Sequence, residues 1–194
     1  TPAALERALR TRVAEGRSAR LVASFAREWK TKGHNNPHSL PPAQQDFYIP
    51  YLEENGQRRF WSRVWNYTPH EAGYSWFIQA PEESLLSVDP LCEVGCPYAV
   101  RGFDFDYVGV LWLSDLKSRE GRWIVDLEHV HETGLSRTRG KASKRRNDAT
   151  ARRRLMRALA QAYRILLTRG IRGVYLWFED EETRARIESS SNGA

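Results

Sequence analysis

Apolar and polar residues follow two periods along the chain, one typical of helices and one typical of buried strands. Residues 3–15 repeat apolar positions at helical spacing, so they predict a helix. A second, longer helix is predicted over 148–167, with Asp148 or Asn147 as its N-cap. The charged segment 179–190 predicts a closing helix.

Short apolar segments between turn residues predict the strands. They are residues 19–25, 74–80, 92–96, 107–113, 122–127 and 173–178. The nearly continuous apolar run 107–113 suits a parallel strand covered on both faces, and 173–178 is predicted to be the next buried strand. Because strands alternate with helices, the pattern indicates an α/β domain with a mainly parallel sheet between helices.

Two stretches do not follow either period. Residues 31–46 are rich in Pro, Asn and Gly and predict a loop. Aromatic residues crowd 47–76, which we do not assign to an element from its sequence. The favoured interpretation is a local aromatic core beneath a long connection, and the alternative is a surface that stacks nucleic-acid bases.

Length and composition predict one globular domain over 1–194. No apolar run approaches the roughly 20 residues of a membrane helix, and no charged-then-apolar leader indicates export. The two cysteines, Cys92 and Cys96, are too few for a disulfide framework, so we expect a reducing, cytoplasmic location. Because the first residue is Thr1 and the sole methionine is Met156, we expect a C-terminal fragment of a longer protein.

The net charge of +6 comes from one segment of the chain. Between 135 and 157 lie ten basic residues against one acidic residue, Asp148, and the remainder of the chain has 20 basic against 23 acidic residues. We expect 135–147 to be a mobile basic loop. The residues expected to contact single-stranded nucleic acid are Lys141, Lys144, Arg145 and Arg146. A solvated loop that binds nothing is the alternative.

One segment superficially matches a phosphate-binding loop. "GLSRTRGKAS", residues 134–143, resembles the Walker A pattern G-x-x-x-x-G-K-[ST]. It has one residue too many between Gly134 and Gly140, and Ala142 stands where a hydroxyl must bind magnesium. The chain therefore has no P-loop of its own.

Two metal sites are conceivable, and neither is favoured. A zinc site would use Cys92, Cys96, His129 and His131. A metal-dependent nuclease would use Asp104, Asp106, Asp126 and Glu128, but no lysine stands at the usual offset. We expect no metal site.

Two segments place charged residues beside predicted strands. In "VRGFDFDYVGVLW", residues 100–112, a turn at Arg101 and Gly102 precedes Asp104, Asp106 and a buried strand. Charged groups at the mouth of a parallel strand are where α/β sheets bind ligands, although the two aspartates could merely cap a turn. In "YRILLTRGIRGVYLWF", Arg169 ends an apolar helix, and a guanidinium is costly to bury without a partner.

These two segments resemble motifs V and VI of superfamily 1 helicases, in that order. The pair is similar to the helicase-like domain family related to the C-terminal helicase region of Schlafen proteins, and a thinner likeness covers 19–30. The resemblance implies a RecA-like three-layer domain, the second motor domain of a helicase. Its partners would be single-stranded DNA or RNA and the first motor domain of the same parent chain, which would hold ATP and Mg²⁺.

The resemblance also implies roles for individual residues. Arg169, held by Thr168, would reach the γ-phosphate of ATP as an arginine finger, and Arg172 is the weaker choice. Arg101, Gly102, Asp104 and Thr168 would contact the nucleotide. Arg101 stands where the family usually has glutamine, and Asp104 where it has glutamate.

Arg27 would correspond to a phosphate-sensing position near the start of the domain. Two alternatives remain open for the whole chain. One is a nucleic-acid-binding module with a degenerate motor fold and no ATP cycle, and the other is the metal-dependent nuclease.

Overall fold

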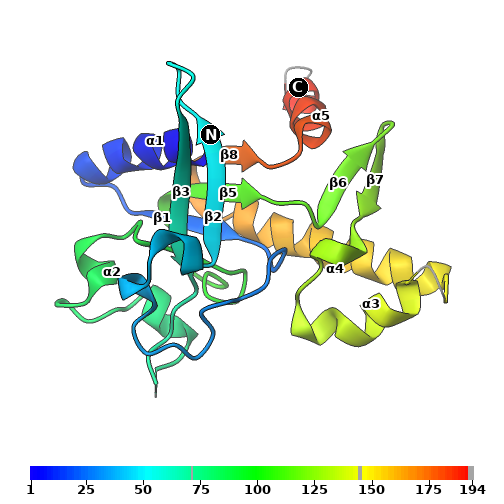
Figure 1. Cartoon of the computed structure of the whole chain (residues 1–194), viewed down its shortest axis with the longest axis horizontal. Coiled ribbons are helices and arrows are strands. Elements are labelled where there is room, and N and C mark those ends of the chain that lie inside the picture. The colour runs from blue at the N-terminus through cyan, green and yellow to red at the C-terminus, as the bar shows by residue number, and fades with distance from the viewer. Residues whose placement is uncertain (71, 144–145, 192–194) are drawn as a thin grey trace.

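A six-stranded sheet forms the centre of the protein in the computed structural model, which describes residues 1–70, 72–143 and 146–191 (Figure 1). Its strand order is β2-β3-β4-β1-β5-β8, and every neighbouring pair is parallel except the hairpin of β2 and β3. The strands are β1 (Ala19–Ala23), β2 (Phe47–Leu52), β3 (Arg58–Trp65), β4 (Glu93–Gly95), β5 (Phe105–Trp112) and β8 (Gly170–Phe178). A separate antiparallel pair consists of β6 (Leu116–Arg119) and β7 (Arg122–Val125).

Helices cover both faces of this sheet. The α-helices are α1 (Pro2–Ala14), α2 (Leu85–Val88), α3 (Ser136–Ala142), α4 (Ala149–Leu167) and α5 (Glu181–Ser191). Short 3₁₀ turns are η1 (Pro37–Ser39), η2 (Pro42–Gln44), η3 (Tyr74–Phe77), η4 (Leu127–His129) and η5 (Thr133–Leu135). No helix of the described residues has the length and apolar character needed to cross a membrane.

The central strand β5 shows how the layers pack. Gly109 lies under α1, where a Cβ atom would come within 2.6 Å of Leu5 and Leu9, so only glycine permits this close approach. Trp112, which points to the opposite face, stacks on Tyr163 of α4 with 4.0 Å between ring centroids. Helices therefore enclose the sheet from both sides, and the predicted α/β fold class is confirmed.

Several predicted elements are confirmed with small changes of boundary. α1, β1, β4, β5, α4 and α5 lie where the apolar pattern indicates. Asp148 is the N-cap of α4, because its Oδ1 accepts bonds from the backbone N–H groups of Thr150 and Ala151. The segment 122–127 does contain a strand, but that strand pairs only with β6, outside the main sheet.

Other predictions are wrong. Residues 74–80 contain the turn η3 in place of a strand, because their backbone N–H groups bond to nearby carbonyls, as from Ile78 to Ser75 at 2.9 Å, and not to a neighbouring strand. β8 is an edge strand whose residues are half-buried or exposed, not a fully buried one. The predicted loop 135–147 includes the helix α3.

Candidate nucleotide and nucleic-acid sites

Arg169 and Asp104 meet where two neighbouring parallel strands begin. Asp104 immediately precedes β5 and Arg169 immediately precedes β8, and the pairing of these strands holds the two residues side by side. Nη1 of Arg169 lies 3.0 Å from Oδ1 of Asp104. The structure thus brings together the aspartate and the arginine that the two helicase-like motifs single out.

The position of this pair differs from the usual ligand crevice of α/β sheets, which lies outside the carboxyl ends of the strands. Asp104 and Asp106 lie at the amino end of β5. The prediction of a ligand site at the mouth of the strand is therefore wrong for these residues. Only their likeness to the helicase motif connects them with a nucleotide.

Arg169 also closes the end of α4. Its Nε donates to the carbonyl of Ile165 at 3.1 Å, its Nη1 to the carbonyl of Phe103 at 3.3 Å, and its Nη2 to Oγ1 of Thr168 at 3.2 Å. Oγ1 of Thr168 donates in turn to the carbonyl of Arg164 at 2.8 Å. The bond to Ile165 supplies a partner for a carbonyl of the last helical turn, and the bond to Phe103 joins the helix end to the residue before Asp104, so Arg169 has a structural role in any case.

Asp106 makes a second connection along the same edge. Its Oδ1 accepts from Nε of Arg172 at 2.6 Å, and its Oδ2 accepts from the backbone N–H of Ser18 at 3.0 Å. The hydrogen bond from the Ser18 backbone and the Arg172 guanidinium hold the pKa of Asp106 below its usual value. Both Asp106 and Arg172 therefore have partners that tie β1, β5 and β8 together.

The turn at Arg101 and Gly102 lies against α4. Gly102 has φ of +88°, a left-handed conformation that favours glycine. Arg101 is exposed and lines a pocket of about 210 Å³ whose wall includes Ile165, the residue that accepts the Nε bond of Arg169. Arg101, Gly102, Asp104 and Thr168 are thus gathered around the C-terminal end of α4.

Arg27 lies at the other end of β8. It forms an ion pair with Glu179, which directly follows that strand and also accepts from Oγ of Ser114 at 2.8 Å. β8 has nine residues, and at about 3.3 Å per residue it separates Arg27 from Arg169 by about 30 Å. One phosphate group cannot contact both arginines.

A buried polar network occupies the carboxyl edge of the sheet. The hydroxyl of Tyr163 donates to Oδ1 of Asp115 at 2.6 Å, and Oγ of Ser24 donates to Oδ2 of Asp115 at 2.9 Å. Burial raises the pKa of Asp115 above its usual value, and these two hydrogen bonds oppose the change. This network was not predicted from the sequence, although an aspartate just after a buried strand was an available signal.

The basic segment forms part of a two-helix surface. Arg137 and Lys141 of α3 and Arg154 of α4 line a small pocket of about 130 Å³. Arg139 has an internal partner, because its Nη1 donates to the carbonyl of Val130 at 2.5 Å. Arg146 is exposed beyond α3. The predicted contacts Lys144 and Arg145 lie outside the described residues.

Neither conceivable metal site is assembled. Asp126 hydrogen-bonds through its backbone to Asp115, beyond the carboxyl end of β5, whereas Asp104 precedes the amino end of that strand. The four carboxylates of the nuclease hypothesis are therefore divided between opposite edges of the sheet. Burial raises the pKa of Cys92 and of Cys96 to about 12, which disfavours the thiolates that bind zinc. No group of three or more potential ligands occurs among the residues that the structure describes.

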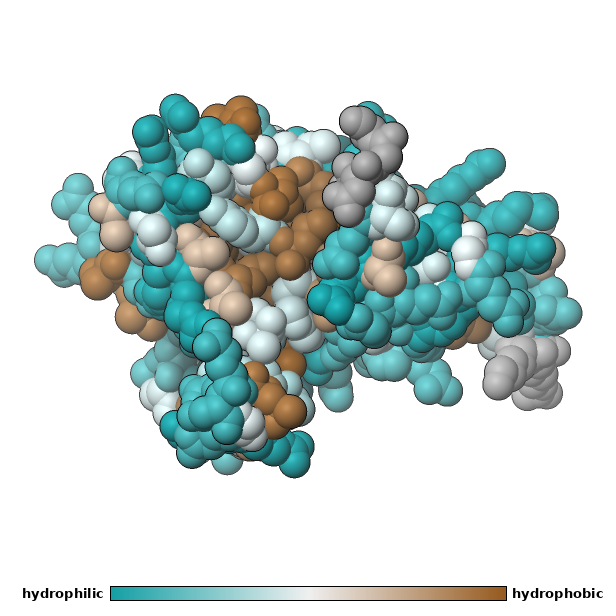
Figure 2. Space-filling model, turned by 90° about the horizontal axis from the view of Figure 1, so that it is seen from above, coloured by the Kyte–Doolittle hydropathy of each residue, from teal (hydrophilic) through white to brown (hydrophobic). Residues whose placement is uncertain are grey.

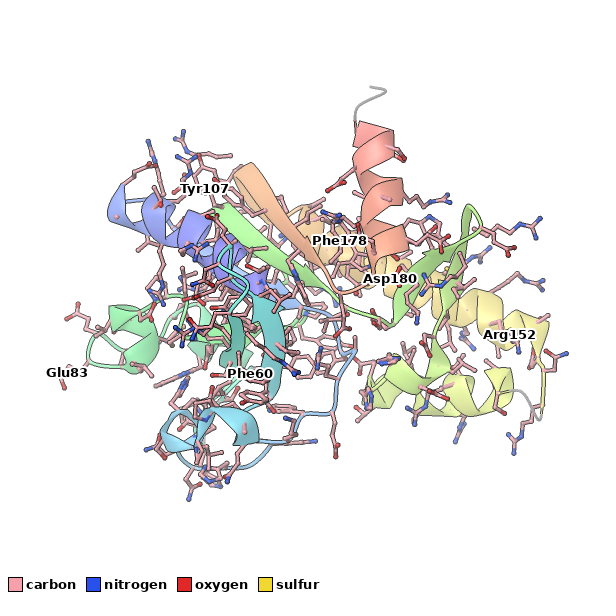
Figure 3. All side chains as sticks on the ribbon, turned by 45° about the horizontal axis from the view of Figure 1, so that its top comes forward. Phe60, Glu83, Tyr107, Arg152, Phe178 and Asp180 are labelled. Carbon is pink, nitrogen blue, oxygen red and sulfur yellow. The ribbon has the colours of Figure 1, made fainter. Side chains whose placement is uncertain are left out.

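The aromatic stretch 47–76 has two faces. Phe47, Trp61 and Trp65 belong to the core, as the favoured interpretation predicts. On the outer face of the hairpin, Tyr48 and Phe60 stack with centroids 4.4 Å apart, and Phe60 is 45% exposed. Figure 3 shows Phe60 far from Arg152 of α4, so this aromatic pair and the basic surface lie on different parts of the molecule.

A wide pocket lies away from all of these residues. Figure 2 shows a hollow with apolar atoms on its floor. Residues of β2, β8 and α5 and the first two residues of the chain line this hollow, which has a volume of about 930 Å³. None of the predicted site residues lines it.

Comparison with known proteins gives a family and a distant relative. The family model described as "Schlafen group 3, DNA/RNA helicase domain" matches residues 1–180. An uncharacterized protein of Saccharomyces cerevisiae, YPL245W, is 29% identical over 143 residues, which cover 74% of this chain and 28% of that protein. The match thus spans less than a third of the relative's length. No solved structure matches the chain significantly.

Proposed function

The chain belongs to the Schlafen group 3 DNA/RNA helicase domain family, and from this premise we propose that it is the second motor domain of a helicase-type ATPase. In this proposal ATP and Mg²⁺ are held mainly by a first motor domain of the same parent chain. Arg169 reaches across to the γ-phosphate, and repeated closing and opening moves a single strand of DNA or RNA.

The observation that carries this proposal is the placement of Arg169 beside Asp104. Thr168 and Arg169 end a 19-residue helix, and the chain then enters β8 directly. A rigid helix end fixes the backbone from which the guanidinium projects. A cation in such a position suits phosphoryl transfer, in which negative charge develops on the oxygens of the transferred group.

Asp104 would have to release Arg169 when ATP binds. Asp104 is 56% exposed, and exposed ion pairs of this kind contribute only about 0–1 kcal/mol. A γ-phosphate has more negative charge than one carboxylate and can replace it at low cost. The bond from Nε of Arg169 to the carbonyl of Ile165 would keep the inner end of the guanidinium in place during this exchange.

A second candidate is a nucleic-acid-binding module that retains the motor fold without an ATP cycle. It is favoured by the three hydrogen bonds and the ion pair of Arg169, which explain this residue without any nucleotide.

ATP hydrolysis with and without single-stranded nucleic acid separates the two functions. The motor proposal predicts strand-stimulated hydrolysis by the full parent protein and none above background by this chain alone. The binding module predicts strand binding without stimulated hydrolysis. Turnover by the isolated chain that a mutation in its own residues abolishes would overturn the proposal of a half-motor.

A further inference from the structure

Two pockets adjoin on one side of α4 and differ in chemistry. The first, here called the apolar pocket, has a volume of about 210 Å³, roughly seven times the share of one water molecule in the liquid. Its walls include Phe25, Tyr98, Ala158 and Ala162. Tyr98 is 48% exposed, and its ring lies 5.8 Å from that of Phe25, so an aromatic surface lines the opening.

A few polar groups border this apolar pocket. They belong to Arg101, Glu132 and Gln161. Oε1 of Glu132 accepts from the backbone N–H of Gly134 at 3.1 Å, which orients the carboxylate. An apolar slot with an oriented acceptor and neighbouring donors is the kind of site that holds a nucleic-acid base, by contact with its faces and by hydrogen bonds to its edge.

The second pocket, here called the cationic pocket, has a volume of about 130 Å³ and lies between α3 and α4. Arg137, Lys141 and Arg154 line it, and none of the three forms an ion pair with another described residue. Its one carboxylate, Asp148, is engaged in capping α4. Three cations around a small cavity, none of them paired with a carboxylate of the described residues, favour a phosphate group.

The spacing of the two pockets matches one nucleotide unit. Arg154 of the cationic pocket and Ala158 of the apolar pocket are four residues apart on α4, one helical turn or about 6 Å along its axis. On the other wall of the two pockets, Leu135 of the apolar pocket is two residues from Arg137 of the cationic pocket. A phosphate in the cationic pocket and the neighbouring base in the apolar pocket would therefore be at the separation found within one nucleotide.

We propose that the surface between α3 and α4 binds one nucleotide of a single strand, with its phosphate in the cationic pocket and its base in the apolar pocket. The proposal rests on the proposed nucleic-acid function and names the place where a base is recognised. Because Glu132 can accept a hydrogen bond from an exocyclic amino group, the pocket prefers cytosine to uracil.

Two matched variants on α4 test the apolar pocket. Ala162→Phe fills it, whereas Ala160→Phe makes the same change two residues earlier, on the side of α4 that faces Trp112 and Trp123. Affinities of the full chain for oligo(C), oligo(U) and an abasic strand of equal length are measured by fluorescence anisotropy. We expect Ala162→Phe to weaken oligo(C) binding about tenfold, towards that of the abasic strand, and Ala160→Phe to leave it unchanged.

Glu132→Gln provides a test that does not depend on filling the pocket. Its amide oxygen can still accept the bond from Gly134, but its charge is lost, so the preference for oligo(C) over oligo(U) should decrease. Equal binding of oligo(C) and the abasic strand by the unmodified chain would overturn the apolar pocket and leave the nucleic-acid function intact. Failure to bind any strand at low salt would overturn both.

Discussion

The hydroxyl of Tyr163 lies at the centre of the buried hydrogen-bond network at the carboxyl edge of the sheet. It donates to Oδ1 of Asp115 at 2.6 Å and accepts from the backbone N–H of Leu113 at 3.1 Å, while Oγ of Ser24, 3.1 Å away, donates its one hydrogen to Oδ2 of Asp115. All four residues are almost fully buried. Through these bonds α4, whose far end bears Arg169, is joined to β1 and to the end of β5.

Tyr163→Phe removes this oxygen and keeps the ring stacked on Trp112. A hydrogen bond to a charged group contributes about 1.5–3 kcal/mol, and a buried donor left without a partner costs about 1–3 kcal/mol. Asp115 keeps its bonds from Ser24 and from the backbone of Leu116, so it is not left without partners. We therefore expect the free energy of unfolding to fall by about 3–5 kcal/mol.

Urea unfolding of the isolated chain measures this loss, with Tyr175→Phe as the control. The hydroxyl of Tyr175 accepts one bond, from Nε of Arg12 at 2.9 Å in a half-exposed site, and its removal should cost about 1 kcal/mol or less. A loss for Tyr163→Phe no larger than that for Tyr175→Phe would refute the account of the buried network.

Three further predictions concern charge. Asp115→Asn should reduce the dependence of stability on pH. The raised pKa of Asp115 contributes stability that is present below the pKa of the unfolded state and is lost as pH rises through the pKa of the folded state, by at most about 1.4 kcal/mol per pH unit. A variant whose urea unfolding has the same pH profile as the unmodified chain would contradict this. Asp104→Asn should change the free energy of unfolding by less than about 1 kcal/mol, because Asp104 is largely exposed, and a greater loss would assign it a structural role. Changing Lys144, Arg145 and Arg146 together to alanine should lower the slope of log affinity against log salt by about two for a single strand of any base sequence, whereas an unchanged slope would show that these charges do not contact phosphates.

The fold was predictable where apolar runs are long and regular. β5 and α4 follow directly from 107–113 and 148–167, because each buries a continuous apolar face. The hairpin of β2 and β3 was missed although Asn55 and Gly56, with φ of +79° at Gly56, are a typical hairpin signal. The crowded aromatic residues obscured the alternation between its buried and exposed faces.

The candidate sites could be predicted only where their residues belong to short segments of the sequence. Arg169 and Asp104 lie in local motifs, and their meeting follows once β5 and β8 are parallel neighbours. Tyr163 and Asp115 are 48 positions apart, and no local pattern indicates their contact. The close contact between Phe77 of η3 and Gly95 likewise joins residues that are far apart in the sequence, and no local pattern indicates it.

The central claim is tested most directly by Arg169→Ala in the full parent protein, with kcat for ATP and the Kd for a single strand measured on the same preparation. The account predicts that kcat falls by about 10³ or more while strand affinity is nearly unchanged, and that Arg169→Lys restores little because lysine lacks the planar fork. Arg172→Ala, which removes the neighbouring arginine paired with Asp106, is the control and should retain most of the activity. Equal losses of hydrolysis and strand binding in Arg169→Ala would show that Arg169 only closes the end of α4, and would contradict the account.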